Sequence, residues 1–367
     1  MINEKRLIDS FVKLVGIDNP SHGERGICDF IKAELSSLGI EAREDGSAAV
    51  TGGNCGNLYA FVDGEGEPLL LSAHMDSVDP ARGKRAVIAD DGRITSAGDT
   101  VLGADDLSGV AVILEALRSV KESGARHRPI ELVFDAAEET YCDGIQQFDF
   151  ASLKSKQGYI FDLTGAVGEA AYQAPAIISF KAEIKGKAAH AAFSPEEGVH
   201  AIKAAAAAVA AVECGRVGDT TVNIGMISGG AADNVVPENC VLTGEVRGFD
   251  NDTVYERLAL IERAVTDAAE GLGASVKFST QPLCLAYRVD PDGEVASRFR
   301  TACADVGLEP KLVVTYGGSD NNHCFHHGVS GLVVACGMNN CHSCSEYSDV
   351  NELINAARLA EALMLGK

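Results

Sequence analysis

Five residues of metal-ligand type lie at or just after the ends of hydrophobic, strand-like runs that are spread over most of this chain. They are His74, Asp105, Glu139, Asp162 and His342. The runs, in the same order, are residues 69–71, 94–102, 130–134, 159–161 and 332–335. In an open α/β sheet, ligand sites form in the crevice beyond the carboxyl ends of the strands. The pattern therefore predicts an α/β sheet that brings five ligands together at one metal site.

Two imidazoles and three carboxylates suit zinc, with manganese and cobalt as alternatives. The set also divides evenly between two ions. One ion would take His74, Asp162 and Asp105 with a water, and the other would take Glu139, His342 and Asp105 with the same water. Each ion is then four-coordinate, and three carboxylates with a hydroxide balance two divalent cations. This count of ligands and charges predicts a dinuclear site bridged by Asp105.

The order of helical and strand-like patterns indicates two domains. Residues 1–175 alternate the two patterns, which predicts a mixed, mostly parallel sheet with helices on both faces. Helices are expected at residues 3–15, 26–38, 107–120 and 350–365. A β-α-β-β-α-β order follows Pro175, with elements at residues 177–184, 200–212, 221–227, 241–246, 253–269 and 275–280. We expect residues 1–176 and 286–367 to form the metal-binding domain, and residues 177–285 to form an inserted two-layer α+β domain.

Composition narrows the class of partner and the cellular compartment. The net charge of −22 argues against nucleic acid and against an anionic membrane surface. Eleven cysteines, an odd number without small-scaffold spacing, favour reduced thiols. The charged N-terminus has no apolar signal core, and no apolar stretch reaches the ~20 residues of a spanning helix. These features predict a cytoplasmic protein.

Acidic residues beside the predicted ligands have assignable roles. Asp76, two residues after His74, is placed to accept the second imidazole N–H, although the His-x-Asp pattern alone is as often structural. Asp106 is expected to cap the helix that follows it, which leaves Asp105 free to bridge two cations. The side chains of Glu138 and Glu139 diverge, so one can bind metal while the other faces the substrate water. Adjacent glutamates are usually solvated surface, but these follow a strand that is expected to be buried.

Taken together, these motifs resemble the M20 family of dinuclear zinc peptidases. The resemblance rests on His74-Met75-Asp76, Gly103-Ala104-Asp105-Asp106, Ala137-Glu138-Glu139, Asp162 and His342. Gly317-Gly318-Ser319-Asp320 and Arg247-Gly248-Phe249-Asp250 are similar to the peptidase T (tripeptide aminopeptidase) branch. The motifs occur in the family's order over almost the whole chain. The resemblance implies that Glu138 is the catalytic base, that Glu139 is a ligand and that Asp76 is the partner of His74.

The resemblance also implies roles for the inserted domain, residues 177–285, as a lid and dimer interface. His190 would reach the partner subunit's active site and stabilise the oxyanion. Asn234 would assist from the lid, and Arg247 would grip the terminal carboxylate of the substrate, a role that suits a guanidinium fork. Without the family, His190 is simply a loop histidine and Arg247 simply ends a strand.

The resulting hypothesis is a cytoplasmic, homodimeric metallopeptidase that hydrolyses the N-terminal peptide bond of short peptides. Two divalent ions, zinc before cobalt or manganese, activate a bridging water, and Glu138 serves as general base and then as general acid. Two alternatives stay open. One is an M20-type amidohydrolase of other specificity, such as an aminoacylase or carboxypeptidase, against which Asp162 in place of a glutamate argues modestly. The other is a non-catalytic peptide- or metal-binding protein, against which the intact Glu138 argues.

Two segments depart from the family pattern and leave the substrate open. Residues 321–327 contain His323, His326 and His327 where small or aliphatic residues are expected. Cys341 and Cys344 flank the last predicted ligand with a Cys-x-x-Cys spacing, but no second pair accompanies them. Both segments are interpreted as pocket variation, with an added metal site as the alternative.

Overall fold

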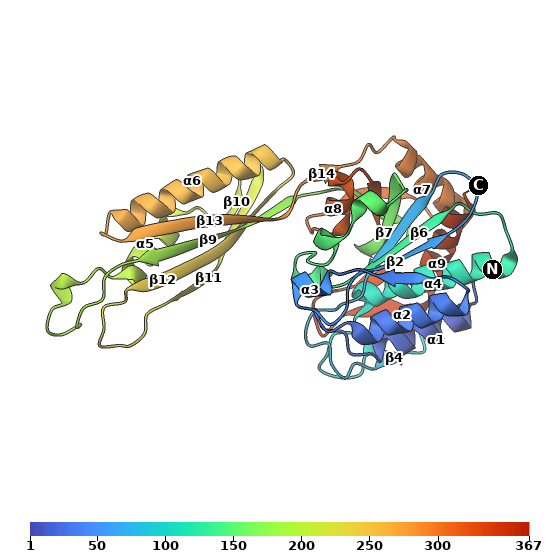
Figure 1. Ribbon diagram of the computed structural model, residues 1–367, viewed down its shortest axis with the longest axis horizontal. Helices are drawn as coiled ribbons and strands as arrows, with labels where there is room; N and C mark the ends of the chain where they lie inside the picture. The colour runs from blue at the N-terminus through green and yellow to red at the C-terminus, as the bar shows by residue number, and fades with distance from the viewer. Residues whose placement is uncertain (367) are drawn as a thin grey trace. The chain divides into compact units, whose positions relative to one another are not determined.

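The computed structural model describes residues 1–366, which divide into two compact units (Figure 1). Unit 1 consists of Met1–Gln173 together with the residues from Arg288 onward, and unit 2 is Ala174–Tyr287. Unit 2 is therefore an insertion in the chain of unit 1.

Unit 1 is built on a large mixed sheet. Its main path runs β1-β2-β6-β3-β7-β16-β17-β5-β4. Off this path, β8 pairs with β16, and β14 and β15 pair with β8. The strands are β1 (Ala42–Glu44), β2 (Leu58–Val62), β3 (Leu69–His74), β4 (Ala86–Ile88), β5 (Arg93–Ser96), β6 (Ile130–Asp135), β7 (Gln157–Thr164), β8 (Glu169–Ala174), β15 (Lys311–Val314), β16 (Ser330–Asn339) and β17 (Tyr347–Asp349), and β14 (Tyr287–Arg288) carries the chain back from the insertion.

Parallel pairing is concentrated at the centre of this sheet. The pairs β6·β3, β3·β7 and β7·β16 are parallel, whereas the flanking pairs along the main path are antiparallel. Every residue of β3 and β6 is buried, as expected for strands that are covered on both faces. The predicted mixed α/β sheet is confirmed, and the carboxyl ends of its central strands meet at one edge.

The helices of unit 1 cover its sheet. They are α1 (Glu4–Val15), α2 (Arg25–Ser37), α3 (Ala48–Thr51), α4 (Ala104–Ser123), α7 (Glu294–Asp305), α8 (Asp320–His326) and α9 (Val350–Leu365). The long helix α4 is buried over nearly its whole length and packs on β3, β7 and β16 as well as on α1 and α9. The helices expected from periodicity are all present. No helix in the described part of the chain combines the length and apolar character that crossing a bilayer requires.

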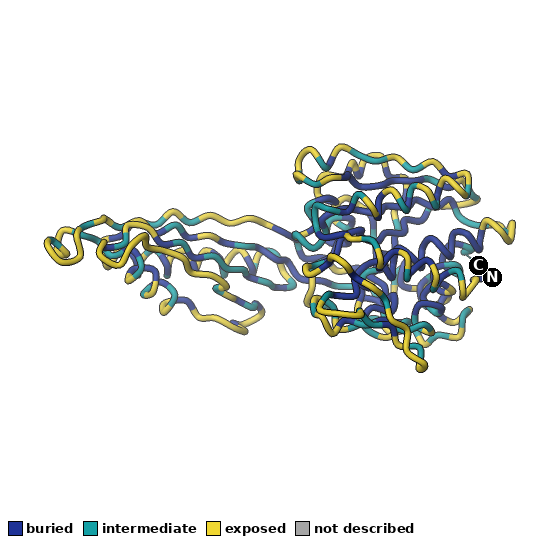
Figure 2. The backbone as a smooth tube through the Cα atoms, turned by 90° about the horizontal axis from the view of Figure 1, so that it is seen from below, coloured by how far each residue is buried: buried dark blue, intermediate teal, exposed yellow. Residues whose placement is uncertain are grey.

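Unit 2 is a two-layer α+β unit. An antiparallel sheet with the order β10-β11-β12-β9-β13 carries the helices α5 and α6, which contact each other and the sheet. The elements are β9 (Ala176–Lys185), α5 (Ala201–Ala211), β10 (Gly215–Val217), β11 (Thr220–Gly229), β12 (Asn239–Gly248), α6 (Asn251–Glu270) and β13 (Ser275–Cys284). Along β9, Ile178, Phe180 and Ala182 are buried while the residues between them are more exposed. Figure 2 shows buried and exposed stretches alternating along the backbone of unit 2. The predicted element order is found, with the short β10 added.

Three strand boundaries differ from expectation. Residues 94–102 were expected as one strand, but β5 ends at Ser96, because Gly98 and Asp99 are poor strand residues. The strand β16 continues beyond the expected run 332–335 to Asn339, and it includes Gly337, which has a φ of 92°. The strand β7 continues through Asp162, where its register with β16 is irregular. Such irregularities re-aim side chains beside active sites.

Candidate active site

His74, Asp105 and Asp162 converge from three different elements of unit 1. His74 ends β3, Asp105 lies at the start of α4 and Asp162 lies in β7. The His74 Nε2 atom is 2.9 Å from Asp105 Oδ1 and 3.8 Å from Asp162 Oδ1. Burial raises the pKa of Asp162 well above its ordinary value, and the charge of Asp105 acts in the same direction. The imidazole of His74 and the carboxylates of Asp105 and Asp162 therefore lie close together in the interior of unit 1.

A second group forms on the other side of the same aspartate. The His342 Nε2 atom is 2.9 Å from Glu139 Oε2 and 3.3 Å from Asp105 Oδ2. The two oxygens of Asp105 thus face different imidazoles. The structure brings all five predicted ligands together, in the two groups that the sequence indicated.

The donor set fits divalent cations. The ligand atoms of His74, Asp105 and Glu139 lie within 4.8 Å of one another. Glu139 Oε1 is buried without a hydrogen-bond partner. Burial and the charge of Asp105 raise the pKa of Glu139, so crowding of these carboxylates is unfavourable unless positive charge is present. Carboxylate oxygens and imidazole nitrogens are the donors that zinc, cobalt and manganese accept.

Asp106 also lies near this cluster, but its carboxylate is already engaged. Its Oδ1 accepts a hydrogen bond from the Gly109 N–H at 3.1 Å, and its Oδ2 accepts one from the His74 N–H at 3.1 Å. The first bond caps the helix, as predicted, and the second fixes the end of β3. Both oxygens of Asp106 are therefore engaged by backbone N–H groups, whereas the two oxygens of Asp105 face the imidazoles of His74 and His342.

Asp76 connects the imidazole of His74 to the turn that holds the two glutamates. Its Oδ1 is 3.3 Å from His74 Nδ1. The same carboxylate accepts hydrogen bonds from the N–H groups of Glu138 and Glu139, at 2.9 and 3.1 Å. Burial alone would raise the pKa of Asp76, but hydrogen bonds, that from His74 foremost, hold it below its ordinary value. An ionised Asp76 thus orients one predicted ligand and the turn that carries the predicted base.

Glu138 lies on this turn with an environment that favours proton uptake. Ala137 precedes it in the left-handed conformation, with a φ of 58°. The Cys142 thiol donates to Glu138 Oε1 at 3.3 Å. Burial raises the pKa of Glu138 well above its ordinary value; His74 opposes this shift, whereas Asp320 and Glu139 add to it. A raised pKa suits a carboxylate that must take up and release a proton near neutral pH.

Two supports of this turn are absent from the residues predicted from the sequence. Glu24 accepts hydrogen bonds from the N–H groups of His22 and Ala137, at 2.7 and 3.0 Å. The Ser21 hydroxyl donates to Asp76 at 2.7 Å. Both residues lie in the polar loop between α1 and α2. The polar character of this segment was the only indication, because nothing in its spacing links Glu24 to Ala137, 113 residues away, or Ser21 to Asp76, 55 residues away.

In unit 2, His190 and Asn234 occupy neighbouring loops. His190 forms an antiparallel bridge with Val235, and the Ala191 N–H donates to the Asn234 carbonyl at 3.0 Å. Both side chains are exposed. The N–H groups of Ala192 and Phe193 donate to His190 Nδ1, at 3.1 and 3.2 Å. Because Nδ1 is the acceptor, the proton of the neutral imidazole lies on Nε2, which is left as a donor.

Arg247 lies at the opposite end of the same sheet. It pairs with Ile177 of β9, close to where the chain enters unit 2, whereas Asn239, near the Asn234 loop, pairs with Lys185. Eight strand residues separate these positions, which is roughly 26 Å. Arg247 donates from Nε and Nη2 to the two oxygens of Glu245, at 2.7 and 3.2 Å. Asp250, three residues after Arg247, caps α6 by accepting a hydrogen bond from the Thr253 N–H.

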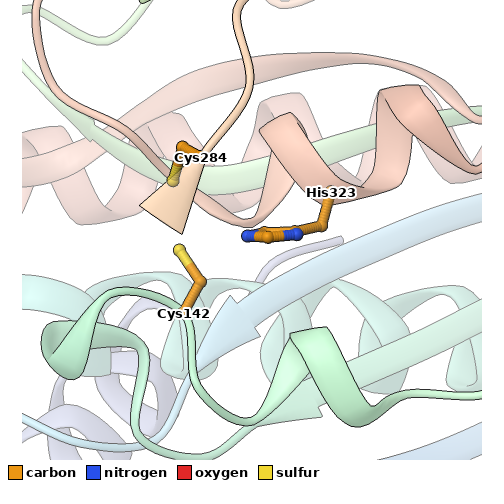
Figure 3. Close-up of side chains that lie close together, drawn as sticks. All are labelled: Cys142, Cys284 and His323. Atoms are coloured by element: carbon orange, nitrogen blue, oxygen red, sulfur yellow. The ribbon is translucent and has the colours of Figure 1, made fainter. Parts of the chain in front are cut away.

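The histidine-rich segment forms α8, and its histidines diverge. His326 and His327 are exposed, and the His327 ring stacks on Phe150 with a centroid distance of 4.1 Å. His323 turns instead toward the loop that follows Glu139, and Figure 3 shows its imidazole and the Cys142 thiol pointing toward each other. Among the described residues, neither His326 nor His327 belongs to a metal-binding cluster. Cys341 and Cys344 are free thiols, the second of them exposed.

Comparison with known proteins identifies the class. The chain matches the model of a peptidase dimerisation domain at residues 173–272 and that of peptidase family M28 at residues 57–209. It is 31% identical to the uncharacterized protein YqjE of Bacillus subtilis, over 99% of both chains.

Two solved structures are similar over the full length. One is the aminopeptidase PepT from Bacillus cereus, with 33% identity and a TM-score of 0.89, covering 100% of this chain and 99% of that one. The other is a tripeptidase from Staphylococcus aureus, with 30% identity and a TM-score of 0.93, covering 99% and 98%. The fold and these relatives define a metallopeptidase. The chain belongs to the M20 peptidase family and is similar to its peptidase T branch.

Proposed function

We propose that this protein is a dinuclear metal-dependent aminopeptidase that removes the N-terminal residue of short peptides, tripeptides above all. The observation that carries the proposal is the position of Asp105, whose two oxygens face His74 and His342. A single carboxylate between two imidazoles, with Asp162 on one side and Glu139 on the other, matches the ligand needs of two ions. The names of the B. cereus and S. aureus neighbours support the peptide class.

The proposed ligands divide into two sets. His74, Asp105 and Asp162 would hold one ion, and Glu139, Asp105 and His342 would hold the other. Zinc fits this donor set well, and cobalt or manganese are the alternatives. Bound divalent ions would lower the pKa of the attacking water and polarise the scissile carbonyl.

The chain's own residues carry the proton. The Glu138 carboxylate would accept a proton from the attacking water and donate it to the leaving amine. Its raised pKa supports both halves of this task. Asp76 would keep the His74 imidazole in one orientation and, through its bonds to the N–H groups of Glu138 and Glu139, fix the base relative to the ligands.

Unit 2 would act as the lid and dimerisation domain, with unit 1 as the catalytic domain. The His190 Nε2–H, free to donate, suits an oxyanion, and Asn234 on the neighbouring loop would assist. Arg247 would bind the terminal carboxylate of the substrate. The roughly 26 Å of sheet between the two ends exceeds the length of a tripeptide, about 11 Å when extended. One lid therefore cannot supply both groups to one substrate, which supports His190 acting from the partner subunit of a homodimer.

A tripeptide panel tests the activity. The protein is loaded with zinc, cobalt or manganese and offered free, N-acetylated and C-amidated forms of the same tripeptides. Release of the N-terminal residue from the free form alone is expected. Preference for the N-acetylated form would instead indicate an aminoacylase, and release of the C-terminal residue would indicate a carboxypeptidase.

Mixed dimers test the role of His190. Protein carrying His190→Ala and protein carrying Glu138→Gln are each expected to be inactive. A mixture that exchanges subunits should recover activity, because a hybrid contains one site with both groups intact. If hybrids form and remain inactive, His190 does not act across the dimer.

A further inference from the structure

Glu346 is a buried carboxylate whose two oxygens both end on the backbone of the Asp105 loop. Its Oε2 accepts a hydrogen bond from the Gly103 N–H at 2.7 Å, and its Oε1 accepts one from the Asp105 N–H at 2.9 Å. Its side chain is almost inaccessible, with 2% of the residue exposed. A carboxylate that accepts two N–H bonds in a protein interior makes strong, directional contacts. Neither the sequence motifs nor the proposed mechanism uses this residue.

The carbonyl side of Asp105 is held as well. The Ser77 hydroxyl donates to the Asp105 carbonyl at 3.1 Å, and the Asn19 amide donates to Ser77 Oγ at 3.1 Å. Asp105 is therefore fixed at its N–H by Glu346 and at its carbonyl by Ser77.

The buried Lys84 closes this arrangement beside Gly103. Its ammonium donates to the Asn19 side-chain oxygen. A Cβ atom on Gly103 would lie 2.8 Å from Lys84 Nζ and 2.9 Å from Ser77 Oγ. Gly103 also has a φ of 74°, so only glycine fits here without strain. Lys84 and Ser77 thus lie directly against Gly103, on the loop that carries Asp105.

Glu346 also belongs to the segment that carries His342. It lies four residues after that histidine, immediately before β17. Asp105 and His342 approach to 3.3 Å. The carboxylate of Glu346 therefore links the segment that carries His342 to the loop that carries Asp105, and the side chains of these two residues meet in the candidate site.

We propose that Glu346 is a positioning residue that holds Asp105 in its bridging place and couples it to the His342 segment. The inference rests on the proposed function, since it assigns Glu346 a task only where Asp105 serves two ions. Loss of the clamp lets the Asp105 backbone move, so affinity falls at both ion positions. Residues that orient metal ligands contribute about 10–100-fold to metal affinity when removed singly.

The test is a cobalt titration of the metal-free full-length protein, followed by its visible absorption. Glu346→Gln keeps the shape of the side chain but replaces one acceptor oxygen with an amide donor. Glu352→Gln is the matched control, because Glu352 is a half-buried carboxylate of the same region that accepts from Asn339 at 2.9 Å and does not contact the Asp105 loop. Glu346→Gln should weaken cobalt binding by about 10–100-fold. Glu352→Gln should leave it within about twofold of the native protein.

Each of the following outcomes is decisive. Native cobalt affinity in Glu346→Gln overturns the inference. A lower melting temperature of the metal-free variant with unchanged cobalt affinity also overturns it, because the carboxylate would then be purely structural. If Glu346→Gln does not fold, Glu346→Asp, which keeps both acceptor oxygens on a shorter side chain, should fold and bind cobalt with intermediate affinity, and native affinity of Glu346→Asp would overturn the inference. A native protein that binds no cobalt would instead contradict the proposed function.

Discussion

The two units differ in where they keep their charge. In unit 1, many ionisable side chains are buried, among them His74, Asp76, Lys84, Asp106 and Glu346. Among the described residues of unit 2, Thr220 is the one buried residue that is not apolar, aromatic or cysteine, and the core consists of Ile, Val, Leu, Phe and Ala together with Cys240. Burial of a charge is costly unless it is paired or coordinated, whereas burial of apolar surface is favourable.

This difference corresponds to different roles of the two units. The buried charges of unit 1 are unfavourable by themselves, but a site that activates water needs charged groups that are shielded from solvent. Unit 2 is stabilised by ordinary apolar packing, and its candidate functional groups, His190 and Asn234, are exposed on loops. Unit 1 should therefore depend on its metal ions, and unit 2 should not. The predictions below test that contrast.

The largest effect is expected at the base. Glu138 is not needed by either predicted ligand set, so Glu138→Gln should retain two metal ions and lose activity by at least ~100-fold and up to ~10⁴-fold. Metal content by mass spectrometry and steady-state kinetics check this. Full metal content with near-native turnover would show that another group takes the proton.

Removal of the metal ions should affect the two units unequally. Ions present at about 1,000 times their dissociation constant stabilise the folded state by about 4 kcal/mol. Chelation should therefore reduce hydrogen-exchange protection about 1,000-fold in β3 and β6 of unit 1, while β9 and β12 of unit 2 keep theirs. Exchange monitored by mass spectrometry gives both values in one experiment. Equal losses in both units would mean that they unfold together, and the contrast would fail.

Much of this could be predicted from the sequence, because ligands and helices leave local patterns. The periodicity of residues 3–15 and 350–365 predicted α1 and α9, and the positions of His74, Glu139 and Asp162 near strand ends predicted their convergence. That convergence follows from sheet topology, since the carboxyl ends of central parallel strands share one edge.

The parts that could not be predicted depend on tertiary contacts without a local pattern. Glu24 and Glu346 are single carboxylates in loops, and their partners lie 113 and 241 or more residues away. The carboxylate that pairs with Arg247 is a further contact that the sequence did not identify. Glu245 faces it only because residues two apart share one side of a strand, while Asp250 is taken by the start of α6.

A medium effect is expected at Arg247, the one candidate of unit 2 that is already ion-paired. Arg247→Ala should reduce kcat/KM for free-acid tripeptides by about 2–3 kcal/mol, or roughly 30–150-fold, and should erase the preference over amidated peptides. The fold and the metal content should not change, because a surface pair contributes at most ~1 kcal/mol to stability.

Glu245→Gln is the matched variant for this experiment. It removes the carboxylate that holds the guanidinium but keeps the guanidinium itself, so the preference for free-acid peptides should persist. Equal rates on free-acid and amidated tripeptides in the native enzyme would exclude carboxylate recognition by Arg247.

The smallest effect compares a half-buried ion pair of unit 1 with a more exposed ion pair of unit 2. In unit 1, Arg25 donates to both oxygens of Glu44, at 2.5 and 3.0 Å, and these bonds lower the pKa of Glu44 from 4.5 to about 2. In unit 2, Glu183 pairs with Lys181 at 2.8 Å on the surface of the sheet. Glu44→Gln should destabilise the protein by about 1 kcal/mol at pH 7, a value reduced from the full shift by solvent screening. Glu183→Gln should have no measurable effect.

The pH dependence fixes the sign of the Glu44 contribution. Its pKa is lower in the folded than in the unfolded state, so the stabilisation is complete above about pH 4.5 and is lost as the pH falls toward 2. Urea unfolding of the native protein and of Glu44→Gln, both metal-free, should therefore differ at pH 7 and converge as the pH is lowered through this window. Because metal is absent from both samples, the difference reports the ion pair and not the site. A difference that stays constant down to pH 3 would assign the effect to packing of the Glu44 side chain, and the charge at this edge of unit 1 would then contribute no more than that of Glu183 in unit 2.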